Sequence, residues 1–569
     1  MPLGRWFLTA SAFCLATPAL AQKTPGSDIV VTSDITKKKQ AITWKRAESD
    51  HVIVFSQGSD AELTRVAKNI ERLYHLMSRL YRRGDESDVT VKLQVTLVDS
   101  AADLRAMRLA DLRSTEGPYL QVFDDQAYYD PRADGAVLAV ARSDRTADLN
   151  TSRAQDLDCT DALADGAMEC DPPIGRAAIY YTPAIRTWEQ RLYGAYARHF
   201  LLTYAPAVYP RWYLDGIGAL FSTLTVRGNG AVDYAAPPEN YRQVLRSYVR
   251  LDVADVLSGR YLTGVPGKAG WNPYQAWLLT HYFVFSALKP DRYRQYQAYM
   301  AAIAAGKPMA EAAAVFGDMK RLNQDLFDYV DRDKSYARTA PAQPIGAEPT
   351  VSILSPGGAA TVLARLQLDT QLAATDADGA ARRDGWIAQL RETIGKLPFN
   401  PDATLLLAEA ECRAGQPAAC VADADRVLAA SPDNVRALAW RGVALTDRAV
   451  NGEAPYRAAR LALARDAIKR ALAIDGDSPL ALIAQFQSYA LAGERVPDTA
   501  MAGMAGVVRL VPAAPAPRLY LAEELLRQQQ ADAARRLIRI VIDGAYDSPE
   551  RTVALREFGS AMGAPASGR

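Results

Sequence analysis

The sequence predicts an α+β domain followed by an all-α solenoid of helical repeats. Strand-like runs alternate with helical periodicity in the first part of the chain, and a proline-rich segment at residues 340–358 ends that pattern. Beyond this segment the composition shifts to alanine, leucine and arginine, which favours helices. We therefore expect the α+β domain over residues 44–335, a linker over 336–360 and the helical repeats over 361–560.

The α+β assignment depends on short apolar runs on either side of a long amphipathic helix. Residues 52–56 read as a strand, and apolar residues alternate strictly from Val91 to Leu97, as in a half-buried strand. Between these runs, apolar side chains recur at helical spacing from Leu63 to Leu80. Two further β-rich runs are expected at 136–141 and 178–181. This order of elements supports an α+β fold.

The second half of this domain is expected to be almost wholly helical. A helical pattern begins at Trp188 and continues through residues 192–330. Glycine and proline clusters interrupt the pattern at 228–230, 237–238 and 264–270. Such clusters predict turns between helices.

The amino-terminal end reads as an export signal. Residues 1–21 combine Arg5, an apolar run and small residues before Gln22, which is typical of a secretory signal peptide. Residues 22–43 read as a disordered leader. No other run approaches the roughly eighteen apolar residues that span a bilayer, so no membrane span is expected. We therefore expect an exported, periplasmic protein.

The overall charge argues against nucleic acid and anionic membranes as partners. The chain carries 66 basic and 65 acidic residues, which gives a formal net charge of +1. A balance of this kind provides no general attraction to polyanions. We therefore expect no nucleic-acid partner.

Four cysteines follow the expected signal peptide, and they form two pairs that are close in sequence. Cys159 lies near Cys170, and Cys412 lies near Cys420. An exported location permits disulfides, and neither pair has the spacing of a zinc knuckle or a CxxC motif. We therefore expect two local disulfides, the second of which joins helices on either side of the turn at Gly415–Pro417.

Turn motifs recur along the carboxy-terminal third and mark the boundaries of helix pairs. They are separated by 31, 47 and 36 residues, which brackets the tetratricopeptide period of about 34 residues if one insertion lies at 450–456. The segment therefore resembles a degenerate tetratricopeptide array, and the concave face of such an array usually holds a protein or peptide. The motifs are Asn400–Ala403, Ser431–Asn434, Asp477–Leu480 and Pro515–Pro517.

Residues 193–221 resemble the core of secreted bacterial gluzincin-like zinc peptidase domains, and the resemblance extends over residues 44–330. In such domains a helix reading roughly His-Glu-Tyr-x-His-His is followed by an aromatic turn and then by Trp-x-x-Glu-Gly-x-Ala. Residues 274–282 are similar to the helix that follows the third ligand in these domains. The matching residues of the core are Tyr196, His199, Phe200, Pro210, Trp212, Gly216 and Ala219.

The resemblance also implies that the zinc chemistry is missing. In HExxH enzymes two histidines four residues apart hold the metal, and the glutamate beside the first acts as general base. Gly194, Ala195 and Arg198 stand at these three positions, and Asp215 replaces the glutamate of the third ligand. We therefore expect no catalytic residue, no bound metal and no cofactor. Instead, the Arg198 guanidinium is expected to pair with the Asp215 carboxylate and to bridge the two helices in place of the metal.

His199, Asp215 and His281 are the weak candidates for an unconventional metal site. His199 follows the second ligand position by one residue, which turns its side chain by about 100° around the helix. His281 lies on the later helix, which packs near the site in the resembled family. Ala195 still leaves such a site without a general base. An active metallopeptidase that binds zinc through these residues stays open as an alternative.

These observations predict an exported, non-catalytic peptidase-like protein with a helical-repeat binding module. Gly194, Ala195, Arg198, His199 and Asp215 are the vestigial site, and the cleft that they border is the vestigial cleft. We expect an envelope protein or peptide to bind either in this cleft or on the repeat face. A structural assembly scaffold is a further alternative, and it predicts a filled cleft without a cavity.

Overall fold

The computed structural model describes most of the chain beyond residue 42. The expected signal peptide, the run at 178–181 and the pair Cys159 and Cys170 lie outside the described residues. No helix in the described part of the chain is long and apolar enough to cross a membrane. The described residues are 43–83, 90–107, 109, 127–142, 187–237, 245, 252–263, 273–285, 290–331, 337–372, 377–546 and 548–559.

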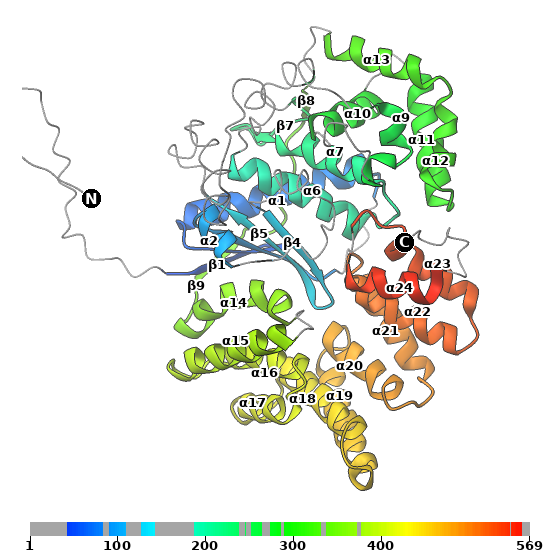
Figure 1. The fold of residues 1–569 in the computed structure, drawn as a ribbon. Coiled ribbons are helices and arrows are strands. Elements are labelled where there is room, and N and C mark those ends of the chain that lie inside the picture. Colours follow the sequence, from blue (N-terminus) through cyan, green and yellow to red (C-terminus); the bar gives the residue numbers. More distant parts are fainter. Residues whose placement is uncertain are drawn as a thin grey trace, which may run out of the picture. The chain divides into compact units, whose positions relative to one another are not determined.

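A six-stranded mixed sheet forms the centre of the front domain, the name we give to residues 43–355 (Figure 1). The strand order is β4-β5-β3-β2-β1-β9, with β3 parallel to both β2 and β5 and the other neighbours antiparallel. The strands expected at 52–56, 91–97 and 136–141 are β2, β3 and β5. The bounds are β1 Lys45–Glu48, β2 Val52–Ser56, β3 Leu93–Val98, β4 Ala127–Arg132, β5 Gly135–Ala141 and β9 Thr350–Ile353.

Helix α1, Asp60–Leu80, covers the sheet through one buried face. The Ser59 hydroxyl accepts a hydrogen bond from the Glu62 amide at 3.2 Å, which caps the first turn. Leu63, Val66 and Ile70 are fully buried in the same core as the strand residues. The helical spacing of these apolar residues predicted this packing.

Three helices, α6, α7 and α10, build the region that contains the vestigial site. They span Trp188–Tyr204, Arg211–Ser222 and Pro273–Phe285. Helix α6 begins at the expected residue because Thr187 and Gln190 form a reciprocal capping box. The other described helices between residues 101 and 331 are α2 Ala101–Ala106, α9 Val253–Leu257, η2 Arg260–Thr263, α11 Pro290–Ala304, α12 Met309–Ala312, η3 Ala313–Phe316 and α13 Met319–Asp331.

A small second sheet interrupts the segment that was expected to be helical. Strands β6, Thr225–Val226, and β7, Val232–Tyr234, form a hairpin, and β8, Arg338–Ala340, pairs with β7. Gly230 has a φ of +80°, which glycine adopts without steric cost. The glycine cluster at 228–230 therefore marks a hairpin turn rather than a break between helices.

The segment expected to be a linker, residues 336–360, instead contributes to both sheets. Strand β9 pairs antiparallel with β1, and β8 pairs antiparallel with β7. Helix α14 already begins at Pro356. Strand β9 is four residues long and lies at the edge of its sheet between Pro349 and Pro356. Because prolines on both sides are typical of a linker, its short β-branched run was not recognised as a strand in the sequence.

Residues 356–559, which we call the helical repeats, fold as successive helix pairs (Figure 1). The four recurring turn motifs lie at the starts of α16, α18, α20 and α22. The insertion expected at 450–456 contains the short helix η4, Ala454–Tyr456. The bounds are α14 Pro356–Leu372, α15 Ala377–Gly395, α16 Pro401–Arg413, α17 Pro417–Ala430, α18 Val435–Val450, α19 Arg457–Ile474, α20 Pro479–Ala490, α21 Asp498–Leu510, α22 Pro515–Arg527, α23 Ala531–Ile542 and α24 Pro549–Phe558.

Buried charges connect the β4–β5 hairpin to the first repeat helix. The Arg132 Nε lies 2.7 Å from an Asp130 oxygen and 2.8 Å from an Asp369 oxygen. In the same region Arg365 of α14 pairs with Asp134 at 2.7 Å. The front domain and the repeats are therefore joined by side-chain contacts as well as by the chain.

Candidate functional site: the vestigial site and its cavity

Helix packing closes the space around Gly194, which the resemblance placed at the first metal ligand. A β-carbon added at Gly194 would lie 2.9 Å from the Gly218 carbonyl oxygen, and one added at Gly218 would lie 3.1 Å from the Gly194 oxygen. The backbones of α6 and α7 approach each other closely here, as small residues permit. A histidine at position 194 would therefore require α7 to move away.

Arg198 and Asp215 lie together, as expected, but a second arginine lies closer to the carboxylate. The Arg198 Nη2 is 3.6 Å from an Asp215 oxygen, whereas the Arg211 Nε is 3.2 Å from both oxygens. Asp215 is buried, and the Arg198 side chain is 18% exposed. The expected Arg198–Asp215 pair thus forms, and Arg211 is the partner that the prediction missed. The spacing of Arg211 and Asp215, four residues apart on one helix, is the signal that predicts their contact.

His199 is buried and faces the sheet rather than Asp215. Its Nδ1 lies 3.0 Å from the Tyr129 hydroxyl and 3.2 Å from the Thr203 hydroxyl. Burial lowers the pKa of His199 to about 3, because the protonated ring would lose its hydration. The imidazole is therefore neutral across the physiological pH range and acts as a hydrogen-bonding core residue.

His281 also has a structural environment of its own. Its side chain is fully buried, its Nδ1 lies 2.8 Å from the Tyr329 hydroxyl, and its ring packs against Trp277 at 4.6 Å between centroids. Across the described ranges, no three His, Cys, Asp or Glu side chains gather in an arrangement that could hold a metal ion. The three weak metal candidates, His199, Asp215 and His281, thus each contact different partners.

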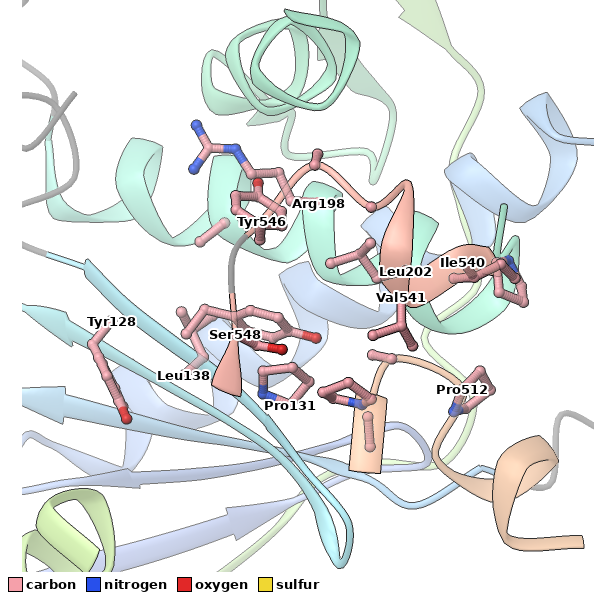
Figure 2. Close-up of a pocket in the computed structure, with 18 of the residues that line it drawn as sticks. Tyr128, Pro131, Leu138, Arg198, Leu202, Pro512, Ile540, Val541, Tyr546 and Ser548 are labelled. Carbon is pink, nitrogen blue, oxygen red and sulfur yellow. The ribbon is translucent and has the colours of Figure 1, made fainter. Parts of the chain in front are cut away.

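A cavity of about 390 Å³ adjoins the vestigial site (Figure 2). One wall comes from α6 and includes Ala195 and Arg198, which the resemblance placed at the general base and the second ligand. The opposite wall comes from the repeats. Sequence reasoning missed these repeat residues, because they lie more than 300 positions from α6 in the chain. The lining residues are Leu104, Leu109, Ala127, Tyr128, Tyr129, Pro131, Leu138, Ala195, Arg198, Leu202, Pro206, Ala207, Arg211, Pro512, Ala513, Ala514, Pro515, Arg518, Ile540, Val541, Gly544, Ala545, Tyr546 and Ser548.

The second expected disulfide forms in the helical repeats. Cys412 of α16 and Cys420 of α17 are bonded, with their Cα atoms 5.2 Å apart. The bond closes the turn that contains Gly415, whose φ is +72°. It fixes one helix pair of the repeats and lies outside the vestigial site.

Comparisons with known proteins give matches to solved structures at low sequence identity. The chain is similar to the crystal structure of TTC0263, a thermophilic TPR protein of Thermus thermophilus, with 19% sequence identity and a TM-score of 0.29, over 34% of this chain and 95% of that chain. It is also similar to the crystal structure of MamA, with 16% identity and a TM-score of 0.21, over 29% of this chain and 93% of that chain. A scan of protein-family models found no match, and neither did a search of curated proteins. The helical-repeat assignment therefore rests on the helix pairs themselves.

Proposed function

We propose that the protein is an exported, non-catalytic binding protein with a peptidase-like front domain. In this proposal the helical repeats hold a protein or peptide partner of the cell envelope. Successive helix pairs joined by short turns form a continuous surface of the kind that binds extended segments of other proteins. The front domain contributes binding and support rather than chemistry.

The observation that carries the non-catalytic part is the contact between Gly194 and Gly218. At 2.9 Å from a backbone oxygen, a side chain at position 194 cannot reach toward a metal without displacing α7. Ala195 supplies no base, and the Arg198 cation would repel a metal ion at the second ligand position. Three separate features of one helix therefore oppose the zinc mechanism.

The cavity beside α6 argues against a purely structural scaffold. A scaffold whose front domain only packs predicts a filled cleft, whereas about 390 Å³ is open between α6 and the repeats. Cavities of this size are typical of ligand-binding proteins. The open cavity therefore does not fit the scaffold alternative.

Metal content and proteolysis test the non-catalytic part. Mature protein purified without chelator is expected to carry well under one zinc ion per chain and to leave unstructured casein intact. Stoichiometric zinc that disappears in the His199→Ala variant, together with chelator-sensitive casein cleavage, would establish the peptidase alternative instead.

Site-specific cross-linking tests the binding part in the exporting cell. A photo-reactive residue at Leu463 of α19, which is 53% exposed, is expected to capture one dominant envelope protein. The matched control is Phe327 of α13, 43% exposed on the front domain, which is expected to capture none in comparable yield. Equal, diffuse labelling from both positions would contradict a partner on the repeats.

A further inference from the structure

The cavity wall combines apolar side chains with positive charge. Three arginines line it, Arg198, Arg211 and Arg518, and the lining contains no aspartate or glutamate among the described residues. Arg198 and Arg211 both pair with the carboxylate of Asp215, which does not line the cavity. The guanidinium of Arg211 also lies 4.5 Å from the centre of the Tyr546 ring. These two cations are therefore already engaged by the protein.

Arg518 differs from the other two arginines. The residue is 7% exposed, and its one hydrogen bond in the described structure runs from Nη2 to the Pro512 carbonyl oxygen at 3.2 Å. Its buried Nε has no hydrogen-bond partner, and no carboxylate among the described residues acts on its charge. Burial lowers the pKa of Arg518 to about 10, so it is still charged at neutral pH. A buried cation without a counter-ion is costly, and an anion in the cavity would relieve that cost.

The amino end of α22 adds positive potential at the same wall. The helix spans 13 residues from Pro515 to Arg527, and its N-cap, Ala514, provides no side-chain cap. Ala513, Ala514 and Pro515 all line the cavity. The helix dipole therefore places partial positive charge beside Arg518, which is favourable for a bound anion.

The rest of the wall suits an aliphatic chain that has no amide groups. Leu202, Val541, Pro131 and Pro512 all contribute apolar side chains to this wall (Figure 2). Four prolines line the cavity and have no backbone N–H group, so they cannot donate to the carbonyl groups of a peptide. The volume of about 390 Å³ lies near the lower end of the range for small-molecule sites, roughly 300–1,000 Å³. Both features favour a single aliphatic chain.

We propose that this cavity binds a single-chain aliphatic carboxylate. The carboxylate lies at Arg518 beside the amino end of α22, and the chain lies against Leu202 of α6 and Val541 of α23. This site goes beyond the proposed function, since it concerns a small molecule rather than the partner on the repeats. The ligand would fill the space between the front domain and the last helix pair.

Calorimetric titration of the mature protein with decanoate tests the proposal, with decan-1-ol as the uncharged control. Decanoate is expected to bind at one site per chain, at least about tenfold more tightly than the alcohol, because a charge-assisted hydrogen bond distinguishes them. Equal affinities would show that the apolar wall alone binds ligands, and the proposal would fail. Tighter binding of N-acetyl-trileucine with a free carboxylate would overturn it in favour of a peptide terminus.

Variants of the wall connect the binding to this cavity. Arg518→Gln is expected to weaken decanoate about tenfold or more, leave decan-1-ol unchanged and raise the unfolding temperature of the empty protein. The control Arg535→Gln removes a surface cation of α23, paired with Asp532 at 2.8 Å, and is expected to change neither ligand. Leu202→Trp, which fills the cavity, is expected to abolish binding of both. Full decanoate affinity in folded Arg518→Gln or Leu202→Trp protein would overturn the assignment.

Discussion

At the residue scale, the charge balance around Asp215 involves two arginines. One buried carboxylate lies between Arg211, at 3.2 Å, and Arg198, at 3.6 Å. The sequence predicted an Arg198–Asp215 pair, and the structure shows a carboxylate shared by two arginines. Because Arg211 keeps Asp215 paired, Arg198 contributes less to stability than a sole partner would.

We expect Asp215→Asn to destabilise the protein more than Arg198→Met. The asparagine leaves two largely buried guanidinium groups without their shared carboxylate, which costs about 3 kcal/mol. Arg198→Met removes a partly exposed cation from a carboxylate that keeps Arg211, which costs about 1 kcal/mol. Urea unfolding of both variants measures the difference. An Arg198→Met cost equal to that of Asp215→Asn would mean that Arg198 is the main partner.

His199 gives the protein a specific acid sensitivity. Its folded pKa of about 3 lies below the usual value of 6.5, so below pH 6.5 the unfolded chain binds a proton that the folded protein does not. Stability due to this residue is therefore complete above pH 6.5 and is lost as the pH falls toward 3. At about pH 5 the expected loss is about 2 kcal/mol.

The His199→Gln variant is expected to lose this part of the pH dependence. The difference in unfolding free energy between about pH 7.5 and about pH 5 should shrink by about 2 kcal/mol relative to the unaltered protein. Glutamine is a suitable replacement because it can still bond to Tyr129 or Thr203. An unchanged difference would show that His199 is not buried in its neutral form.

At the scale of elements, glycines set the spacing of α6, α7 and α10. A β-carbon at Gly216 would lie 2.6 Å from the Ala276 carbonyl oxygen of α10, even closer than the 2.9 Å between a β-carbon at Gly194 and Gly218. Both obstacles are backbone atoms, which cannot rotate away. From the resemblance to a peptidase helix, Gly194 was interpreted as a position that has lost a metal ligand. In the structure, Gly194 allows α6 and α7 to pack closely.

Alanine substitutions at Gly216, Gly194 and Gly385 should change the free energy of unfolding according to the space available for a β-carbon. We expect Gly216→Ala to cost about 3 kcal/mol and Gly194→Ala about 1–2 kcal/mol, as overpacked sites do. Gly385, inside α15, is the control, since nothing lies within 4 Å of its added β-carbon. There, alanine should stabilise the helix by roughly 0.5–1 kcal/mol. Thermal unfolding of the three variants checks the order, and a neutral Gly216→Ala would contradict the close packing.

Elements with strong local signals were predictable from the sequence, and short edge elements were not. The start of α6 at Trp188, the strand β5 and the helix-pair starts at Pro401 and Pro515 follow from periodicity and turn residues. Strand β9 did not follow, because its four residues gain their structure from pairing with β1 rather than from their own pattern. Local sequence determines periodic elements, whereas long-range pairing determines short strands.

At the scale of the whole molecule, the cavity is formed by residues that are far apart in the sequence. The local sequence patterns used to predict helices and strands do not reveal such contacts. Its walls combine α6 with residues 512–548, and sequence reasoning treated these as separate domains. The Val91 amide donates to the Leu510 carbonyl oxygen at 3.0 Å, and Arg539 donates to the Ile303 carbonyl oxygen at 2.7 Å. Contacts between residues this far apart in sequence are the physical reason that the cavity could not be predicted.

The buried charges at the β4–β5 hairpin suggest that the front domain and the first repeat helices are energetically coupled. The Arg132 side chain is 4% exposed and pairs with Asp130 of the hairpin and Asp369 of α14. Its Nη2 also donates to the Leu366 carbonyl oxygen at 3.1 Å. One guanidinium therefore contacts a strand and a repeat helix, and it is shared by two carboxylates, of which Asp369 also pairs with Arg413.

Replacing this arginine should loosen both sides of the contact at once. Arg132→Leu leaves two carboxylates without their shared cation, which we expect to cost about 3 kcal/mol or more. Hydrogen exchange measured by mass spectrometry should then accelerate in both β4–β5 and α14, because neither side keeps the other closed. The control Arg441→Leu removes a surface pair with Asp425, 2.8 Å apart, and should leave both regions unchanged. If α14 in Arg132→Leu keeps its protection against hydrogen exchange while β4–β5 loses it, the front domain and the repeats are not coupled through this residue. In that case the contacts of Leu510 with Val91 and of Arg539 with Ile303 would connect the two parts.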